Sequence, residues 1–423
     1  MGAEASASIG LMETTMWLLG SICSATAAGF YVQVSHQLGS NDPARARSTL
    51  RQGIMSVLVV SALLGLVSLA VSPFLPTWLG GNSHITPTAS AYFAIVATAL
   101  PIFQFSIFGA GMLRSSGNMV VPSVMSVVMM SLDVVFNFFL IFPTRPMELF
   151  GTQIMMPGMG MGVMGAAIGT VSAELVAASI TMYILCFRSK ELSLRIDTGR
   201  FLPTWGVVKR ALHISLPMGL QQTIMCSAYV MTTIIIAPLG TFAIAANSFG
   251  IIIESLCYMP GYGIADAATT LVGQSMGAGR YELMKRFAWL SVGLGVTVMA
   301  VMGVVMYVGA PVAMAMMTPA EEVRRLGVEI LRIEAFAEPM FAAAIVSYGV
   351  FVGAAKTLVP SIMNLISIWG VRISLAAMLA PSMGLRGVWI AMCIELCFRG
   401  LIFLVKLKFW NIQTSCKHYG KDQ

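Results

Sequence analysis

Among the acidic residues inside long apolar stretches of this sequence are Asp133, Glu254, Glu334 and Glu338. A charged side chain at the centre of a membrane helix costs roughly 2.5–3.5 kcal/mol on insertion scales, so each of these residues is a functional-site hypothesis by default. A carboxylate in such a place can take up a proton, or it can ligate Na⁺ together with other oxygens. The chemistry that these residues suggest is therefore the binding of a coupling ion.

Glu334 and Glu338 are spaced i, i+4, which places them on one face of a continuous helix. Two close carboxylates cannot both ionise cheaply in a low dielectric, so the pair is a candidate proton acceptor. The alternative is that Glu334 lies near the membrane surface and pairs with Arg332 or with a neighbouring helix. Glu254 has Tyr258 at i+4 and no obvious local cation. It suits binding a proton or a cationic compound, or else it is a buried, hydrogen-bonded carboxyl.

Two arginines also lie in apolar stretches. Arg399 follows Glu395 by four residues, and this spacing predicts an ion pair on one helix. For Arg372 we expect the neutralisation of a nearby glutamate. For Asp133 the alternative to ion binding is a packing role, with its carboxyl bonded to a neighbouring Ser or Asn.

Composition identifies the chain as an integral membrane protein. Hydrophobic residues make up 57% of its 423 residues, charged residues only 10%, and the mean hydropathy is +0.83. A soluble domain has about 25% charged residues. The seven cysteines form no CxxC pair, and the position of most of them in apolar segments favours free thiols over a disulfide framework.

Apolar runs of spanning length recur along the chain. We expect eleven spans in an all-α polytopic protein, at residues 8–34, 53–72, 89–113, 119–142, 160–187, 211–236, 243–272, 286–310, 328–353, 359–380 and 386–408. The basic residues concentrate in the 35–52, 187–210 and 273–286 loops. The positive-inside rule places these loops and the C-terminus in the cytoplasm.

An internal repeat organises these spans. Residues 95–125 align without a gap to residues 333–363 at a constant offset (333 − 95 = 238), and eleven of the 31 positions are identical. The identities include Pro101/Pro339 and Gly111/Gly349. Two copies of one multi-helix unit are a recurrent plan of transporters. We expect the paired prolines to bend the paired helices, because proline removes a helical hydrogen bond and clashes with the preceding turn.

The repeat predicts a six-plus-six plan with pseudo-symmetric lobes. At the same offset, residue 1 aligns with Leu239, so helix 211–236 of the second copy has no counterpart in the first. We therefore expect an N-lobe at 1–187 with five of six helices, a cytoplasmic linker at 188–210, a C-lobe at 211–408 and a cytoplasmic tail at 409–423. The segment 143–159 is an insertion without counterpart.

Several motifs add to this plan. They are His36-Gln-Leu-Gly-Ser-Asn-Asp42, Val272-Gly-Gln-Ser-Met-Gly-Ala-Gly-Arg280, Leu113-Arg-Ser-Ser-Gly-Asn118, Leu132-Asp133, Gly165-Ala-Ala-Ile-Gly-Thr170 and Leu216-Pro-Met-Gly-Leu-Gln221. Together they resemble the MATE family of multidrug and toxic-compound extrusion transporters, over essentially the whole chain. The resemblance implies two six-helix lobes around a cavity that opens alternately to either side. The helix without counterpart is the main departure from the family pattern.

The resemblance also implies that Asp133 and Thr170 help to form an N-lobe cation site. Two other family positions differ here: the aspartate of the first helix has no counterpart, and the asparagine one turn before Asp133 is Met129. Asn137, one turn after Asp133, could supply an amide oxygen instead. We place the substrate and proton candidates of the C-lobe at Glu254, Glu334 and Glu338.

The function predicted from the sequence is secondary antiport at the inner membrane, exporting organic, often cationic, compounds in exchange for H⁺ or Na⁺. We expect no cofactor, no metal beyond Na⁺ at Asp133, no nucleic-acid partner and a monomer in the lipid bilayer. One rival is a lipid-linked oligosaccharide flippase of the same superfamily, although its cavity would be expected to hold several cations. The others are a truncated, non-functional remnant and a membrane-embedded enzyme; against the enzyme stands the absence of a His/Asp/Glu metal cluster or Ser/His arrangement.

Overall fold

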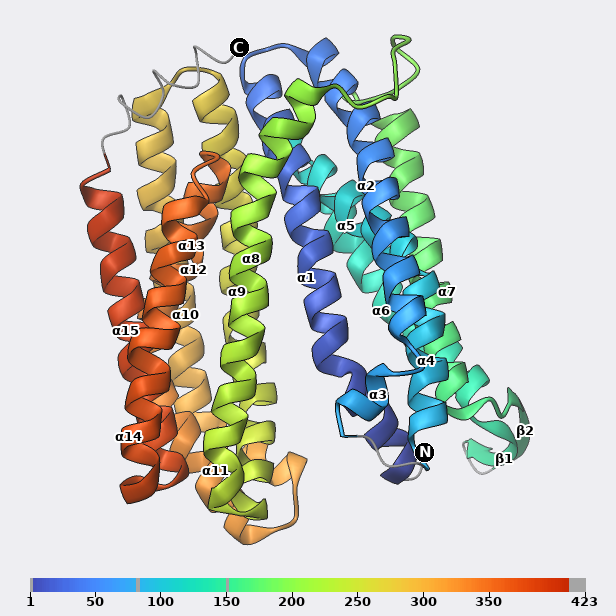
Figure 1. Ribbon diagram of the computed structural model, residues 1–423, viewed down its shortest axis with the longest axis vertical. Helices are drawn as coiled ribbons and strands as arrows, with labels where there is room; N and C mark the ends of the chain where they lie inside the picture. Colours follow the sequence, from blue (N-terminus) through green and yellow to red (C-terminus); the bar gives the residue numbers. More distant parts are fainter. Residues whose placement is uncertain (1–2, 81–83, 150–151, 411–423) are drawn as a thin grey trace. The chain divides into compact units, whose positions relative to one another are not determined.

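The computed structural model describes residues 3–80, 84–149 and 152–410 of the chain. Its helices run alongside one another as bundles within two units, comprising Met1–Gln37 with Asp42–Leu216, and Leu38–Asn41 with Pro217–Gln423 (Figure 1). Within the described residues, nine helices are long and apolar enough to cross a membrane, and eleven spans result if two bent helix pairs are each counted as one. The predicted all-α polytopic fold is confirmed.

The first unit contains α1 to α7 and the start of α8. Its elements are α1 (Ala3–Gly39), α2 (Pro43–Val71), α3 (Leu75–Trp78), α4 (Thr86–Thr98), α5 (Leu100–Ser115), α6 (Val120–Ile141), β1 (Pro143–Leu149), β2 (Thr152–Met159), α7 (Gly162–Tyr183), the π-helix η1 (Ile184–Arg188) and α8 (Trp205–Ile236). The helix α2 begins where Asp42 accepts a hydrogen bond from the backbone N–H of Arg45, with Pro43 at its first position. A capping aspartate and a proline at the first helical position are both typical of helix N-termini.

The second unit contains most of α8 and the helices that follow. These are the 3₁₀ turn η2 (Ala237–Leu239), α9 (Thr241–Gly277), α10 (Tyr281–Met317), α11 (Glu321–Glu334), α12 (Glu338–Gly353), α13 (Leu358–Leu365), the π-helix η3 (Ile366–Ile373), α14 (Ser374–Met383) and α15 (Leu385–Lys408). Its core gathers small and medium apolar residues around the fully buried Trp389, whose indole N–H donates to Asn247 at 3.0 Å.

The bends at the paired prolines are present in both units. The pair α4 and α5 is bent by 48°, and the pair α11 and α12 by 59°. Pro101 and Pro339 each occupy the second position of the helix that follows the bend. At this position the N–H that proline lacks would have no helical partner, so the new helix can form, but the preceding helix cannot continue through the proline. The same residue therefore produces the same bend in both units.

The insertion 143–159 contains an antiparallel hairpin. Strands β1 and β2 pair with Arg145 opposite Met156, and the register shifts between Pro143 and Arg145. The hairpin joins α6 to α7 (Figure 1). The Arg145 guanidinium lies 4.1 Å from the ring centroid of Phe142, a cation–π contact that ties the hairpin to the end of α6.

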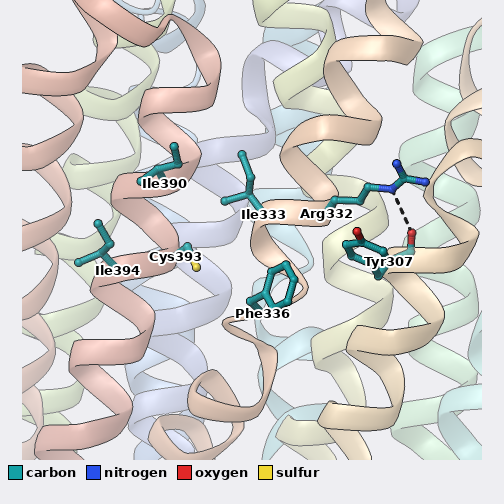
Figure 2. A pocket seen from close by; sticks show the side chains of 7 residues that line it. All are labelled: Tyr307, Arg332, Ile333, Phe336, Ile390, Cys393 and Ile394. Atoms are coloured by element: carbon teal, nitrogen blue, oxygen red, sulfur yellow. Dashed lines mark hydrogen bonds between the residues drawn. The ribbon is translucent and has the colours of Figure 1, made fainter.

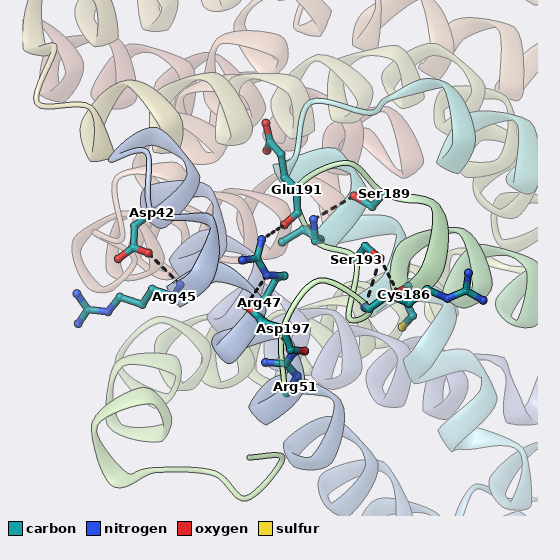
Figure 3. A network of polar contacts seen from close by, with 11 residues as sticks. Asp42, Arg45, Arg47, Arg51, Cys186, Ser189, Glu191, Ser193 and Asp197 are labelled. Atoms are coloured by element: carbon teal, nitrogen blue, oxygen red, sulfur yellow. Dashed lines mark hydrogen bonds and ion pairs between the residues drawn. The ribbon is translucent and has the colours of Figure 1, made fainter. Parts of the chain in front are cut away.

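The segment expected as a linker, 188–210, falls within the first unit, and α8 begins inside it at Trp205. Arg47 of α2 donates from Nε to Asp197 Oδ2 at 2.7 Å and from Nη1 to the Glu191 carbonyl at 3.0 Å, and Arg51 also binds Asp197 (Figure 3). Hydrogen bonds from Arg51 and Arg47 hold the pKa of Asp197 below its ordinary value. The segment is therefore attached to the end of α2 by charged contacts.

Candidate ion-coupling sites

The first candidate site lies where α6 packs against α7. A β-carbon added at Gly165 would lie 2.5 Å from the Leu140 carbonyl oxygen, and one added at Gly169 would overlap Asn137 Oδ1. These two contacts fix the antiparallel register of the helices. Small residues at this spacing permit such close approach in lipid. Asn137 therefore lies opposite Gly169 and Thr170, and the same register places Asp133 one turn further, opposite Ala173 and Glu174.

Two buried oxygens at this site have no hydrogen-bond partner. They are Asp133 Oδ1 and Asn137 Oδ1, one turn apart on α6. A buried polar atom without a partner carries a desolvation cost that a bound cation or proton would offset. Within the described residues, no hydrogen bond joins Asp133 to Ser131, whose hydroxyl donates to the Val127 carbonyl instead. The packing alternative for Asp133 thus lacks the bond on which it depended.

Glu174 is a neighbour of Asp133 that the sequence pattern alone did not single out as a site residue. This α7 residue is buried, forms a hydrogen bond with Ser106 of α5, and interacts electrostatically with Asp133. Asp133 also interacts electrostatically with Tyr92 of α4. The signal was available in the sequence, since Glu174 is an acid within an apolar span. The structure places Glu174 beside Asp133, and Thr170 directly follows Gly169, whose backbone lies against Asn137.

The second candidate site lies inside the second unit, around Glu395 of α15. Arg372 donates to Glu395 Oε2 from Nε at 3.0 Å and from Nη2 at 2.8 Å, and Arg399 forms an ion pair with it at 2.7 Å. Ser367 donates to Oε1 at 2.6 Å. The ion pair predicted between Glu395 and Arg399 is confirmed, and so is the neutralising role of Arg372. Both carboxylate oxygens of Glu395 therefore accept hydrogen bonds, which offset the cost of burying its charge.

Arg372 and Ser367 both lie in the π-helix η3. A π-helix has i→i+5 hydrogen bonds, which widen the turn, and it is frequently found at functional sites. On its other side, η3 borders a small crevice lined by Tyr229, Thr232 and Ala228 of α8 together with Arg372. No feature of the apolar sequence pattern predicts this wider turn.

Glu334 and Glu338 do not share one helix face, so that prediction was wrong. Glu334 ends α11, Glu338 begins α12, and the 59° bend separates them. The reason is Pro339, which cannot continue the α11 hydrogen-bond ladder. Both carboxylates are nevertheless buried, with 1% of each residue exposed, and they interact electrostatically with each other and with Glu254 of α9.

These three acids are less well paired than Glu395. Glu334 Oε2 and both carboxylate oxygens of Glu338 are buried without a hydrogen-bond partner. The alternative pairing of Glu334 with Arg332 is not present, because the Arg332 side chain contacts Tyr307. Glu254 is also buried, within electrostatic range of Arg372 and Arg399. Around the neutralised Glu395, the second unit thus holds three acids that could accept a proton.

Internal repeats, bundles of membrane-spanning helices and buried acids are features that many transporters share. The MatE family model matches residues 1–139 and 217–378, which is well over half of the chain. The chain belongs to the MatE family.

The matches to relatives and to solved structures of similar fold cover most of this MatE chain. It is 25% identical to "Probable multidrug resistance protein NorM" of Thermotoga maritima, over 95% of this chain and 84% of the relative. It is 27% identical to the protein of the same description from Chromobacterium violaceum, over 92% of this chain and 82% of the relative.

Two solved structures have the same fold. A MATE transporter crystallised in the straight conformation is 19% identical, with a TM-score of 0.88, and the match covers 99% of this chain and 90% of that one. A MOP superfamily transporter from Pyrococcus furiosus is 18% identical, with a TM-score of 0.86, and the match covers 96% of this chain and 88% of that one. The similarity to both concerns the fold alone.

Proposed function

We propose that this MatE protein is a multidrug efflux antiporter, which exports small organic, often cationic, compounds in exchange for H⁺ or Na⁺. Its relatives, probable multidrug resistance proteins, support extrusion of drugs over transport of a lipid-linked sugar. The proposed setting is the inner membrane, with the C-terminus in the cytoplasm, as the basic loops indicate. The lobes would be residues 1–187 and 211–408.

The observation that carries the ion-coupling proposal is the pair of partnerless oxygens on Asp133 and Asn137. An ion or proton bound there would neutralise a buried charge and alter the packing of α6 against α7. Thr170, which follows Gly169 on α7, would add a hydroxyl oxygen. Drug affinity and ion occupancy would then be coupled reciprocally, typically by a factor of roughly 5 to 150. The acids Glu254, Glu334 and Glu338 would serve as a second protonation or substrate site.

The test is ethidium efflux from energised cells, with and without a protonophore and over a series of Na⁺ concentrations. We expect Asp133→Asn to remove gradient-driven efflux, because an amide cannot change its charge. Glu338→Gln should reduce it if the second unit also takes up protons. Glu322→Gln is the matched control, since it removes an exposed carboxylate at the start of α11 and should leave efflux unchanged.

Two results would contradict these assignments. Full gradient-driven efflux by Asp133→Asn would exclude the α6 site as the coupling site. Efflux that ignores both the protonophore and Na⁺ would exclude ion antiport altogether. Membrane insertion of each variant is checked by its amount in purified membranes, so that loss of transport is not confused with loss of protein.

A further inference from the structure

The second unit has an open groove at the bend between α11 and α12. It has a volume of about 360 Å³ and is lined mostly by apolar side chains, with one cation at its edge. Phe336 comes from the bend, Ile390 and Ile394 from α15, and Tyr307 from α10, while Arg332 and Ile333 lie in the last turn of α11 (Figure 2). Phe336 is 72% exposed, so a large apolar side chain lies open beside the groove.

Arg332 is an exposed cation that the protein pairs only weakly. Its Nε donates to the Tyr307 carbonyl at 3.4 Å, and its guanidinium carbon lies 5.2 Å from the Tyr307 ring centroid. Among the described residues no carboxylate pairs with it, whereas nearby Arg386 is bound to Glu329 at 2.5 Å. A guanidinium has five N–H donors in a planar fork, so most of those of Arg332 are available. That fork matches the oxygens of a phosphate group.

The position of the groove along the helices gives its depth in a membrane. On α10, Tyr307 follows Trp289 by 18 residues (307 − 289), which is about 27 Å at 1.5 Å per residue. Both side chains are partly exposed. A Trp and a Tyr at that separation match the two aromatic belts of a bilayer whose hydrocarbon core is about 30 Å thick. Tyr307 therefore marks the headgroup level of one leaflet.

Two positions on α15 place the groove at the same depth in the membrane. Ile390 precedes Lys406, in the last turn of this helix, by 16 residues (406 − 390), or about 24 Å. Lysines near the end of a span reach toward the headgroups of their own leaflet. The groove thus lies at the headgroup level of the leaflet opposite the basic loops. An arginine is tolerated at this level, and phosphate groups are concentrated there.

We propose that this groove is a binding site for an anionic phospholipid of that leaflet. The headgroup phosphate binds the Arg332 guanidinium, and an acyl chain lies against Ile333, Phe336 and Ile394. Charge complementarity selects an anionic lipid over a zwitterionic one, because Arg332 adds an unpaired positive charge, while the carboxylate of Glu329, one turn earlier on α11, is already bound by Arg386. The site is independent of the ion-coupling acids and of the transported compound.

The experiment is native mass spectrometry of the full-length protein in detergent, with phosphatidylglycerol and phosphatidylcholine of identical acyl chains in equal amounts. We expect retained adducts to favour phosphatidylglycerol. In Arg332→Gln this preference should fall by about tenfold, as expected for the loss of a charge-assisted hydrogen bond. Arg325→Gln is the matched control, because it removes an exposed charge from the same helix two turns earlier, and its preference should remain.

A second variant tests the apolar part of the groove. Ile394→Trp would fill the space of the acyl chain and should reduce retention of both lipids. Glycerol phosphate, which has no acyl chain, should not be retained by any of the proteins. Equal losses in Arg332→Gln and Arg325→Gln would overturn the proposal, since net charge alone would then explain the preference. Unchanged retention by Ile394→Trp would overturn it as well. A thermal unfolding scan confirms that each variant is folded.

Discussion

Each half of the molecule has one carboxylate bound by two arginines, and the two arrangements differ in burial. In the second unit, Arg372 and Arg399 bind Glu395, whose side chain is 0% exposed. In the first unit, Arg47 and Arg51 bind Asp197, whose side chain is 31% exposed. The same set of charges therefore serves two purposes: one stabilises the interior of a helix bundle, and the other attaches a loop to the end of α2.

The two units also differ in how close their other buried acids lie to an arginine. Asp133 and Glu174 have no ion-pair partner among the described residues of the first unit. The second unit instead places Glu254 and Glu334 within electrostatic range of Arg372. The repeat thus preserves the bends and the helix order but not the charges. The two units therefore differ in how their charges are compensated and in how tightly their helices pack, and three changes test these differences.

The largest effect is expected for Glu395→Gln. Removing one partner of a buried ion pair leaves uncompensated charge in the interior, which typically costs about 3–5 kcal/mol of stability. Here two arginines would lose their carboxylate at once. We expect a large drop in the thermal unfolding temperature of the detergent-solubilised protein, or a failure to accumulate in membranes.

The control for that change is Glu329→Gln, which breaks the more exposed pair with Arg386. Exposed pairs contribute only about 0–1 kcal/mol, so its unfolding temperature should barely move. The double variant Glu395→Gln with Arg372→Gln should recover part of the loss, because one of the two unpaired charges is gone. Equal stability of Glu395→Gln and the native protein would show that the buried network contributes nothing.

The spans, the bends and the Glu395–Arg399 pair could be predicted from the sequence because each depends on local signals. Apolar runs of about 20 residues, a proline and an i, i+4 spacing all act within a few turns of helix. The break between Glu334 and Glu338 followed from the same proline, and the prediction of a shared face failed because it ignored this consequence.

Contacts between distant segments could not be predicted in this way. The approach of Arg372 to Glu395 depends on a π-helical turn, and the docking of Asp197 on α2 joins residues about 150 positions apart. Glu174 was visible as an acid in a span, but its position beside Asp133 depends on the helix register fixed by Gly165 and Gly169. Sequence patterns name the ionisable residues, whereas packing decides which of them meet.

An intermediate effect is expected when alanine replaces the repeat-related glycines. A β-carbon at Gly349 would lie 2.6 Å from the Ala265 carbonyl oxygen, so α9 and α12 would have to separate. Overpacking of this kind costs about 1–3 kcal/mol. A β-carbon at Gly111 would instead meet the Tyr31 ring at 2.5 Å, and a side chain can rotate where a backbone cannot. Gly349→Ala should therefore lower the unfolding temperature more than Gly111→Ala, and the reverse order would contradict the packing.

The smallest effect is expected for Asp197→Asn, and it depends on pH. The arginines keep the pKa of Asp197 below its ordinary value, so the carboxylate contributes stability above that ordinary value, near 4. The contribution is lost as pH falls toward the lowered pKa of the folded state. The unfolding temperature of Asp197→Asn should lie slightly below that of the native protein at neutral pH, and the difference should shrink below about pH 4. A difference that grows on acidification would mean that Asp197 is stabilising in its protonated form, and the contrast with the buried Glu395 would then have to be explained by something other than exposure.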